Sequence, residues 1–157
     1  MNSSLTVTIT GAAGRIAYAL IPLICSGAVF GLETSINLHL LDIEMAHQRL
    51  LGVAMEIDDC NYPLLNKCIA TIDSQEAFTN CEVAILLGGF PRQKGMERKD
   101  LTAINAKGMI PQAYALENFA SSNVKVLVVA NPANTNALIC MEYAPKIPKE
   151  NFTSLPV

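Results

Sequence analysis

A glycine-rich turn near the amino end has the composition of a phosphate-binding turn. Gly11 permits a tight turn after an extended segment, because a Cβ atom there would obstruct the chain reversal. Gly14 leaves the backbone bare where a pyrophosphate must approach, and a helix that begins near it directs unpaired N–H groups and the positive end of its dipole at the phosphates. A plain strand–turn–helix carries the same pattern, so the turn alone is weak evidence. The candidate phosphate site comprises Gly11, Ala12, Ala13, Gly14, Arg15, Ile16 and Ala17.

Asp42 adds a second functional group. It directly follows Ile36–Leu41, an apolar segment that predicts a strand. A carboxylate in this place accepts hydrogen bonds from the ribose hydroxyls of an adenosine. It also repels a 2′-phosphate, so NAD is favoured over NADP. The turn and Asp42 together predict a dinucleotide site with NAD as the cofactor.

The elements that must position these residues form a strand–helix–strand unit. Leu5–Thr10 predicts the first strand, and a helical pattern then continues to about Cys25. Alternating strands and helices imply right-handed crossovers, so we expect one α/β domain with a doubly wound parallel sheet, a Rossmann fold. Further strands are predicted at 68–72, 83–87 and 125–130, and further helices at 44–60, 74–79, 101–120 and 135–143.

Ligands of such sheets bind at the carboxyl ends of the strands. In this chain those ends are Gly11, Asp42, Gly88 and Asn131. Gly88 and its neighbour Gly89 interrupt an apolar run, where a backbone could come close to a cofactor. The residues with binding chemistry and the predicted strand ends therefore coincide.

Three local features qualify this prediction. Pro22 lies inside the first helix, where a proline costs about 3 kcal/mol, so we expect a kink or an early end there. Ser74 is the expected N-cap of the helix at 74–79. Prolines 145, 148 and 156 predict an irregular tail.

Composition narrows the class of protein. The 157 residues suit one domain, and a hydrophobic content of 51% fits a sheet covered on both faces. The net charge of −3, without a Lys/Arg cluster, argues against a nucleic-acid partner. We expect no secretory signal, because Met1–Ser4 lacks a basic region leading into an apolar segment. Apolar runs such as 124–130 are too short to span a bilayer, so no membrane partner is expected.

The cysteines and histidines point to structural roles. The five cysteines form an odd set without a Cys-x-x-Cys pair, which favours reduced, mostly buried thiols in a cytosolic protein. No spacing typical of a metal site is present, so no metal is expected. His39 falls in a predicted strand and His47 on a predicted helix, and both are interpreted as structural.

The segment 89–101, with the sequence GFPRQKGMERKDL, resembles the mobile active-site loop of cytosolic-type malate dehydrogenases. The resemblance extends over nearly the whole chain without obvious gaps. Its other matching segments are 11–17, 40–43, 55–60, 131–136 and 147–152.

The resemblance implies roles for the substrate-binding residues. Arg92 matches the loop arginine that pairs with the second carboxylate of oxaloacetate, and a guanidinium suits a planar carboxylate. Arg98 matches the arginine that stabilises negative charge on the substrate oxygen. Asn131 matches a residue that contacts both substrate and nicotinamide. A solvated basic loop, including Lys94 and Lys99, is the alternative interpretation; by the resemblance, both arginines would face the strand ends.

Further positions align with residues near the cofactor in that family, namely Asn105, Gln112, Val129 and Ala130. Two departures from the family pattern are Arg15, where relatives commonly carry Gln, and the pair at 89–90. Arg15 places an extra cation beside the phosphates. The family also implies a homodimer in the cytoplasm, with the helices at 16–25 and 44–60 facing the partner subunit.

Relatives continue into a sixth strand and a substrate-binding domain that holds the proton-transferring His, its partner Asp and another Arg. We therefore expect residues 1–157 to be an NAD-binding Rossmann domain that stops before the sixth strand, with the C-terminal substrate domain missing. No catalytic residue is assigned within this chain. Hydride transfer from malate requires a base, so the chain alone is expected to bind NAD weakly and to be inactive.

Two other functions compete with an NAD-dependent malate dehydrogenase. Short-chain dehydrogenases and epimerases use Tyr-x-x-x-Lys, and no tyrosine here has a lysine four positions later. A non-catalytic nucleotide-binding or dimerising module remains the alternative.

Overall fold

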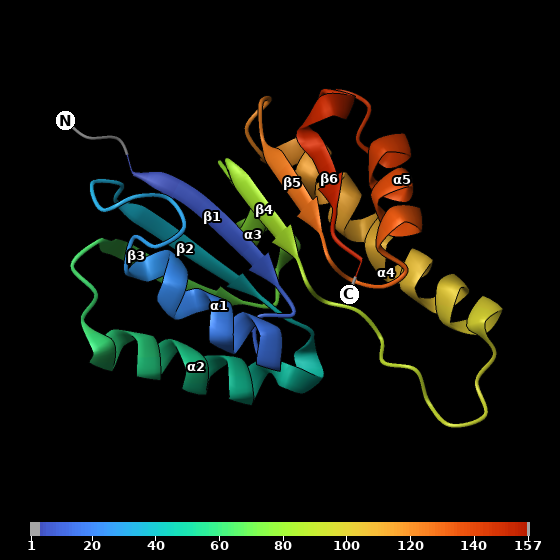
Figure 1. Ribbon diagram of the computed structural model, residues 1–157, viewed down its shortest axis with the longest axis horizontal. Helices are drawn as coiled ribbons and strands as arrows, with labels where there is room; N and C mark the ends of the chain where they lie inside the picture. The colour runs from blue at the N-terminus through green and yellow to red at the C-terminus, as the bar shows by residue number, and fades with distance from the viewer. Residues whose placement is uncertain (1–3, 157) are drawn as a thin grey trace.

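The computed structural model of the protein describes residues 4–156. It contains a 6-stranded sheet in the order β3-β2-β1-β4-β5-β6, in which every neighbouring pair is parallel (Figure 1). This order is that of a doubly wound sheet, because the chain starts near the centre, builds one side outward and then returns to build the other. The predicted Rossmann fold is confirmed. The elements are β1 (Leu5–Thr10), α1 (Arg15–Cys25), β2 (Ile36–Leu41), η1 (Glu44–Ala46), α2 (His47–Cys60), β3 (Leu65–Thr71), α3 (Ser74–Phe78), β4 (Val83–Leu86), α4 (Arg98–Phe119), β5 (Lys125–Val128), α5 (Ala133–Tyr143), η2 (Lys149–Asn151) and β6 (Phe152–Ser154).

Two apolar cores lie on opposite faces of this sheet. In one, Ile24 of α1 and Leu50 of α2 pack with strand residues that include Ile85. In the other, Met109 of α4 packs with residues of α3, α5 and the strands, among them Leu86. Ile85 and Leu86 are consecutive in β4 and belong to different cores, as the alternation of side chains along a strand requires. Both faces of the sheet are therefore covered by helices, in agreement with the apolar composition.

The sixth strand corrects one prediction. We expected the sheet to stop at five strands and the tail to be irregular, whereas β6 pairs with β5, with Val126 opposite Phe152 and Val128 opposite Ser154. Leu155 N–H also donates to the Val128 carbonyl at 2.9 Å. The three residues of β6 are too few to show an alternating pattern, and the prolines around them obscured the signal. Pairing with β5 and packing of Phe152 against the core define this strand.

Two predictions about single residues at helix ends are corrected. α1 continues past Pro22 to Cys25, since Ile21 and Ile24 are buried while Pro22 lies on the exposed side. The N-cap of α3 is Asp73 rather than Ser74, because an Asp73 carboxylate oxygen accepts the Gln75 N–H at 2.9 Å. Short side chains at both positions can cap a helix, so the sequence alone did not distinguish them.

Strand β5 ends earlier than predicted. Val129 and Ala130 both donate their N–H groups to the Leu86 carbonyl, at 3.0 Å each, instead of continuing the regular ladder. The next peptide bond, between Asn131 and Pro132, is cis. The chain therefore turns sharply at the carboxyl end of β5 and enters α5 beside the end of β4.

Candidate nucleotide and substrate site

Gly11 and Gly88 bring the ends of β1 and β4 into direct contact. Gly11 has a φ of +64°, and a Cβ atom built on it would lie 2.6 Å from the Gly88 Cα. A Cβ atom on Gly88 would in turn lie 3.0 Å from the Gly11 nitrogen. Both a left-handed backbone and the lack of space therefore require glycine at position 11. At Gly88 we expected the backbone to approach a cofactor. In the structure this position has no room for a side chain because the turn at Gly11 packs against it.

The amino end of α1 points out of this turn. Gly14 is the N-cap residue with an extended backbone, and no side chain among residues 4–156 caps the helix. A Cβ atom on Gly14 would lie 3.0 Å from the Gly11 carbonyl oxygen. The first N–H groups of a helix lack partners within the helix and attract anions. Of the neighbouring residues, Ala12, Ala13 and Ala17 are buried, while Arg15 and Ile16 are exposed.

The Asp42 carboxylate lies against the same turn. One carboxylate oxygen accepts the Ala13 N–H at 2.9 Å, and the other accepts the N–H of Ile43 at 2.8 Å. These bonds join the end of β2 to the glycine turn after β1. The structure therefore brings Asp42 and the turn together, as a single site for a ribose and two phosphates requires.

Asn105 and Asn131 meet at the ends of β4 and β5. Asn105 comes from α4, is 5% exposed, and donates from its amide nitrogen to the Asn131 carbonyl at 2.9 Å. Its amide oxygen accepts the Phe90 N–H at 2.6 Å. Val129 and Ala130, aligned with cofactor-lining backbone, immediately precede Asn131 and are also buried.

Gln112 lies farther along α4. It is two helical turns after Asn105, so the two side chains share one face of the helix. Its amide nitrogen donates to the Gly108 carbonyl at 3.1 Å. Its amide oxygen is buried and has no hydrogen-bond partner within residues 4–156. A buried acceptor of this kind is available to a donor that joins the site.

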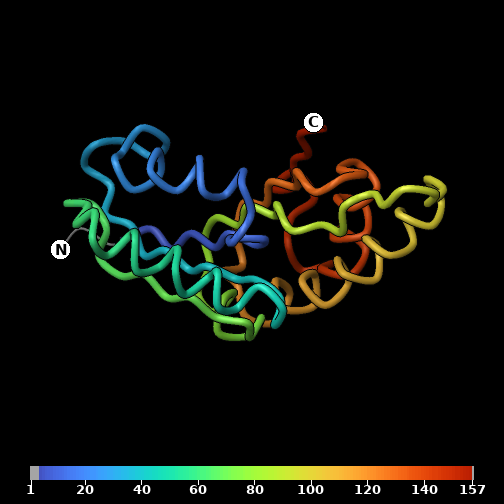
Figure 2. Tube along the Cα trace, turned by 90° about the horizontal axis from the view of Figure 1, so that it is seen from below, coloured from blue at the N-terminus to red at the C-terminus, as the bar shows by residue number. Residues whose placement is uncertain are grey.

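Arg92 and Arg98 are both exposed. We name residues 90–97 the basic loop; it runs from β4 to α4 and reaches one end of the molecule in both views (Figures 1 and 2). Arg92 is exposed and donates to the Met96 carbonyl at 3.3 Å. Arg98 is the exposed first residue of α4. That both arginines face the strand ends therefore stays a prediction.

Both histidines lie outside the site. His39 is 7% exposed, and its Nδ1 lies 2.9 Å from the Ala77 carbonyl oxygen. Burial lowers the pKa of His39, an effect that the Ala77 carbonyl opposes. His47 is the half-buried first residue of α2. Neither side chain is placed to exchange a proton with a substrate at the strand ends.

The cysteines are all free thiols. Burial raises the pKa of Cys25 to about 11 and that of Cys140 to about 12. No group of three or more His, Cys, Asp or Glu side chains that could hold a metal ion occurs in the described part of the chain.

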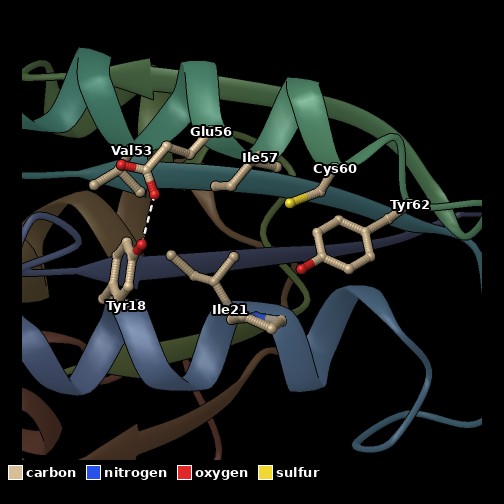
Figure 3. Close-up of a pocket in the computed structure, with 8 residues that line it drawn as sticks. Tyr18, Ile21, Val53, Glu56, Ile57, Cys60 and Tyr62 are labelled. Atoms are coloured by element: carbon tan, nitrogen blue, oxygen red, sulfur yellow. Dashed lines mark hydrogen bonds between the residues drawn. The ribbon is translucent and has the colours of Figure 1, made fainter.

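A separate cavity of about 100 Å³ lies between α1 and α2 (Figure 3). The Tyr18 hydroxyl donates to a Glu56 carboxylate oxygen across it at 2.6 Å, which joins the two helices. None of the strand-end residues lines this cavity. Its lining residues are Tyr18, Ile21, Pro22, Val53, Glu56, Ile57, Cys60 and Tyr62.

The fold and the strand-end residues together define a dinucleotide-binding domain of the Rossmann type. The sequence model described as "lactate/malate dehydrogenase, NAD binding domain" matches residues 5–153. The chain therefore belongs to the lactate/malate dehydrogenase family, as its NAD-binding domain. The prediction of NAD as the cofactor is confirmed at this level.

Curated relatives are identical to this chain at about half of the aligned residues. A malate dehydrogenase of Nicotiana tabacum is 53% identical over 149 residues, which are 95% of this chain and 45% of the relative. A cytoplasmic malate dehydrogenase of Taenia solium is 52% identical over 155 residues, which are 99% of this chain and 47% of the relative. The chain thus spans about half the length of the curated relatives it matches.

Solved structures agree in fold. A malate dehydrogenase of Naegleria fowleri superposes with a TM-score of 0.95 at 44% identity and covers 98% of this chain, which spans 47% of that protein. A lactate dehydrogenase of Trichomonas vaginalis, in complex with NADH and oxamate, gives 0.91 at 40% identity, with 97% of this chain and 46% of that protein covered. Within residues 4–156, no helix combines the length and apolar character needed to cross a membrane.

Asn136 is the site residue that the sequence analysis missed. It lies in α5, is 0% exposed, and donates from its amide nitrogen to the Ala130 carbonyl at 2.8 Å. The available signal was a third asparagine in the segment that begins at Asn131.

Proposed function

We propose that this chain is the cofactor half of an NAD-dependent malate dehydrogenase that interconverts malate and oxaloacetate by hydride transfer. The observation that carries the proposal is the meeting of three features at one edge of the sheet: the uncapped start of α1, the Asp42 carboxylate bonded to the Ala13 N–H, and Asn131 at the end of β5. Identity of more than 50% with malate dehydrogenases supports the substrate class.

The residues at this edge fit NAD. The bare backbone at 11–14 and the uncapped helix suit a pyrophosphate, and Arg15 adds a cation beside it. Asp42 would accept hydrogen bonds from the adenosine ribose. The nicotinamide ring, when bound, accepts the hydride of malate. The remaining cofactor-binding residues in this proposal are Gly88, Asn105, Gln112, Val129, Ala130 and Asn131.

Arg92 and Arg98 are proposed to bind the substrate after a movement of the basic loop. Both arginines are exposed and the basic loop extends to one end of the molecule, so the loop would fold toward the strand ends for them to act. Arg92 would then form a bidentate pair with the distal carboxylate, while Arg98 would stabilise charge on the reacting oxygen. Asn131 would hold that oxygen from the other side.

The proton of the malate hydroxyl must pass to a base, and neither histidine of this chain is placed to act as that base at the strand ends. His39 is buried against Ala77, and His47 is in α2. The proposal therefore includes a further part of the enzyme that contributes the base, and predicts that this polypeptide alone does not turn over malate. A non-catalytic nucleotide-binding module is the alternative for the isolated chain.

Fluorescence titration with NADH and NADPH tests the cofactor assignment. The wild-type chain is expected to bind NADH more tightly than NADPH. Asp42→Asn is expected to reduce that preference about tenfold, because it removes the charge that repels a 2′-phosphate. Asp59→Asn, at an exposed carboxylate in α2, is the matched control and should leave the preference unchanged. Absence of NADH binding, or an unaltered preference in Asp42→Asn, would contradict the assignment.

Assays of NADH oxidation with oxaloacetate test the catalytic part. No turnover is expected from the purified chain, and measurable turnover would refute the need for an external base.

We further propose a homodimer formed through α1 and α2, in a cytoplasmic protein. Both helices expose apolar side chains, with Ile16 at 56%, Leu23 at 51% and Met55 at 68% exposure. Light scattering during size-exclusion chromatography should give twice the 16.9 kDa chain mass. The substitution Met55→Glu should give the mass of a monomer, whereas a monomeric wild-type chain would contradict the proposal.

A further inference from the structure

Two buried asparagines hold consecutive carbonyl groups at the substrate end of the site. Asn136 of α5 donates to the Ala130 carbonyl at 2.8 Å, and Asn105 of α4 donates to the Asn131 carbonyl at 2.9 Å. The two side chains are 0% and 5% exposed. The main chain that carries Asn131 is thus held from two helices at once.

Asn105 also holds the root of the basic loop. Its amide oxygen accepts the Phe90 N–H at 2.6 Å, and its amide nitrogen lies 3.4 Å from the Phe90 carbonyl oxygen. A Cβ atom on Gly89 would lie 3.4 Å from the Ala130 Cβ and 3.5 Å from the Asn105 amide oxygen. The end of β4, the start of the loop and the end of β5 therefore meet around one side chain.

This set of bonds needs a side chain that both donates and accepts, as an amide does. The Asn105 side chain must donate to one carbonyl and accept from one N–H, whereas a carboxylate only accepts and an aliphatic side chain does neither. Asn105 itself is 5% exposed, so loss of its amide removes these bonds from the buried side of the site.

We propose that Asn105 and Asn136 are positioning residues: Asn136 holds Ala130, and Asn105 couples the root of the basic loop to Asn131. The functional consequence of this role rests on the proposed function: the loop arginines and Asn131 keep a defined relative position when the loop moves. The bonds themselves do not depend on a bound cofactor. This role differs from contact with the cofactor, for which the resemblance singled out Asn105.

Limited proteolysis tests the loop without any ligand. Trypsin can cut after Arg92, Lys94 and Arg98, in or next to the basic loop. Asn105→Ala is expected to accelerate these cuts about tenfold, because loss of buried hydrogen bonds raises the population of locally open states. Cleavage after Arg49, on the exposed side of α2, should change much less.

Asn151→Ala is the matched control. Asn151 is 4% exposed and also bonds through both side-chain atoms, to Asn123 and Lys125, but it lies at the opposite edge of the sheet, where β6 begins. This variant should be destabilised without selective cutting in the loop. Equal acceleration in both variants, or none in Asn105→Ala, would overturn the proposed role of Asn105.

Hydrogen exchange tests the role of Asn136 and distinguishes the bond of Asn105 to Phe90 from its bond to Asn131. Asn136→Ala should accelerate exchange of the Val129 and Ala130 amides about tenfold without faster loop cutting. Asn105→Asp keeps an acceptor for the Phe90 N–H but loses the donor to Asn131. Compared with Asn105→Ala, this variant should therefore restore slow loop cutting. Exchange of the amides at 129–131 should still be faster than in the wild-type chain. Unchanged exchange in Asn136→Ala would overturn the proposed role of Asn136. Loop cutting in Asn105→Asp as fast as in Asn105→Ala would overturn the proposed role of Asn105.

These readouts also separate this inference from the proposed function. If wild-type protein fails to bind NADH, the proposed function fails, while proteolysis still decides the role of Asn105. If NADH binds and the loop is cut equally in wild type and Asn105→Ala, the positioning role fails and the cofactor assignment stands.

Discussion

At the residue scale, the glycine turn combines two constraints that act at different positions. Gly11 needs both a positive φ and space next to Gly88, whereas Gly14 leaves room at the start of a helix. Asp42 then closes the turn through the Ala13 N–H. The proposed phosphate site consequently depends on backbone geometry more than on charged side chains.

Substitution of Gly11 tests the first constraint. Gly11→Ala should lower the free energy of unfolding by about 2–4 kcal/mol, because it adds a left-handed alanine and a clash with main chain of β4. Gly52→Ala, inside α2 with nothing within 4 Å of the added Cβ, should instead be neutral or stabilising by up to about 1 kcal/mol. Urea denaturation of both variants measures the difference. Similar effects in the two variants would contradict the steric argument.

The buried His39 predicts a dependence of stability on pH. Burial lowers its pKa in the folded protein below the ordinary value of 6.5, so the unfolded chain binds a proton first as the pH falls. The contribution of His39 is fully present above 6.5 and is lost as the pH falls from there toward the folded pKa. Urea denaturation between pH 7.5 and 5.5 should show a smaller loss in His39→Asn than in wild type. An equal loss would exclude His39 as a cause.

The sequence predicted where the residues of the glycine turn and Asp42 lie relative to one another. Gly11, Gly14 and Asp42 act through main chain close to them in space, and their motif implies that arrangement. The contacts of Asn105 and Asn136 have no comparable motif: Asn105 joins α4 to Phe90 and to Asn131, and Asn136 bonds back to Ala130 six residues earlier, where the chain turns from β5 into α5. The position of Arg92 depends on a loop conformation that local sequence does not determine.

At the element scale, alternation of strands and helices was sufficient to predict the sheet, and errors were confined to ends. Apolar runs identify β1, β2 and β4 because both faces of the sheet are buried. The short β6 is recognisable only through its pairing with β5. α4 begins at Arg98, three residues before the predicted start, because Glu97 and Asp100 form a capping box.

The cap of α3 gives a test at this scale. Asp73→Ala should destabilise the protein by about 1 kcal/mol, because the Gln75 N–H loses its acceptor. Ser74→Ala should have little effect, since Ser74 is already inside the helix. Thermal unfolding of the two variants distinguishes them. A larger effect at Ser74 would show that the cap is assigned to the wrong residue.

At the scale of the whole molecule, the chain forms a six-stranded parallel sheet with helices on both faces and spans about half the length of its curated relatives. The groups proposed for the cofactor lie at one edge of the sheet, while the proposed subunit contact lies on the helices of one face. The basic loop is the element that would connect cofactor and substrate, and its root is fixed by Asn105. We therefore expect cofactor binding to be separable from turnover in this polypeptide.

A crystal structure of the chain with NADH tests the central claim most directly. The account predicts the pyrophosphate at the start of α1, the adenosine ribose on Asp42 and the nicotinamide beside Asn131. A nucleotide bound elsewhere, for instance in the cavity between α1 and α2, or none at saturating NADH, would contradict it.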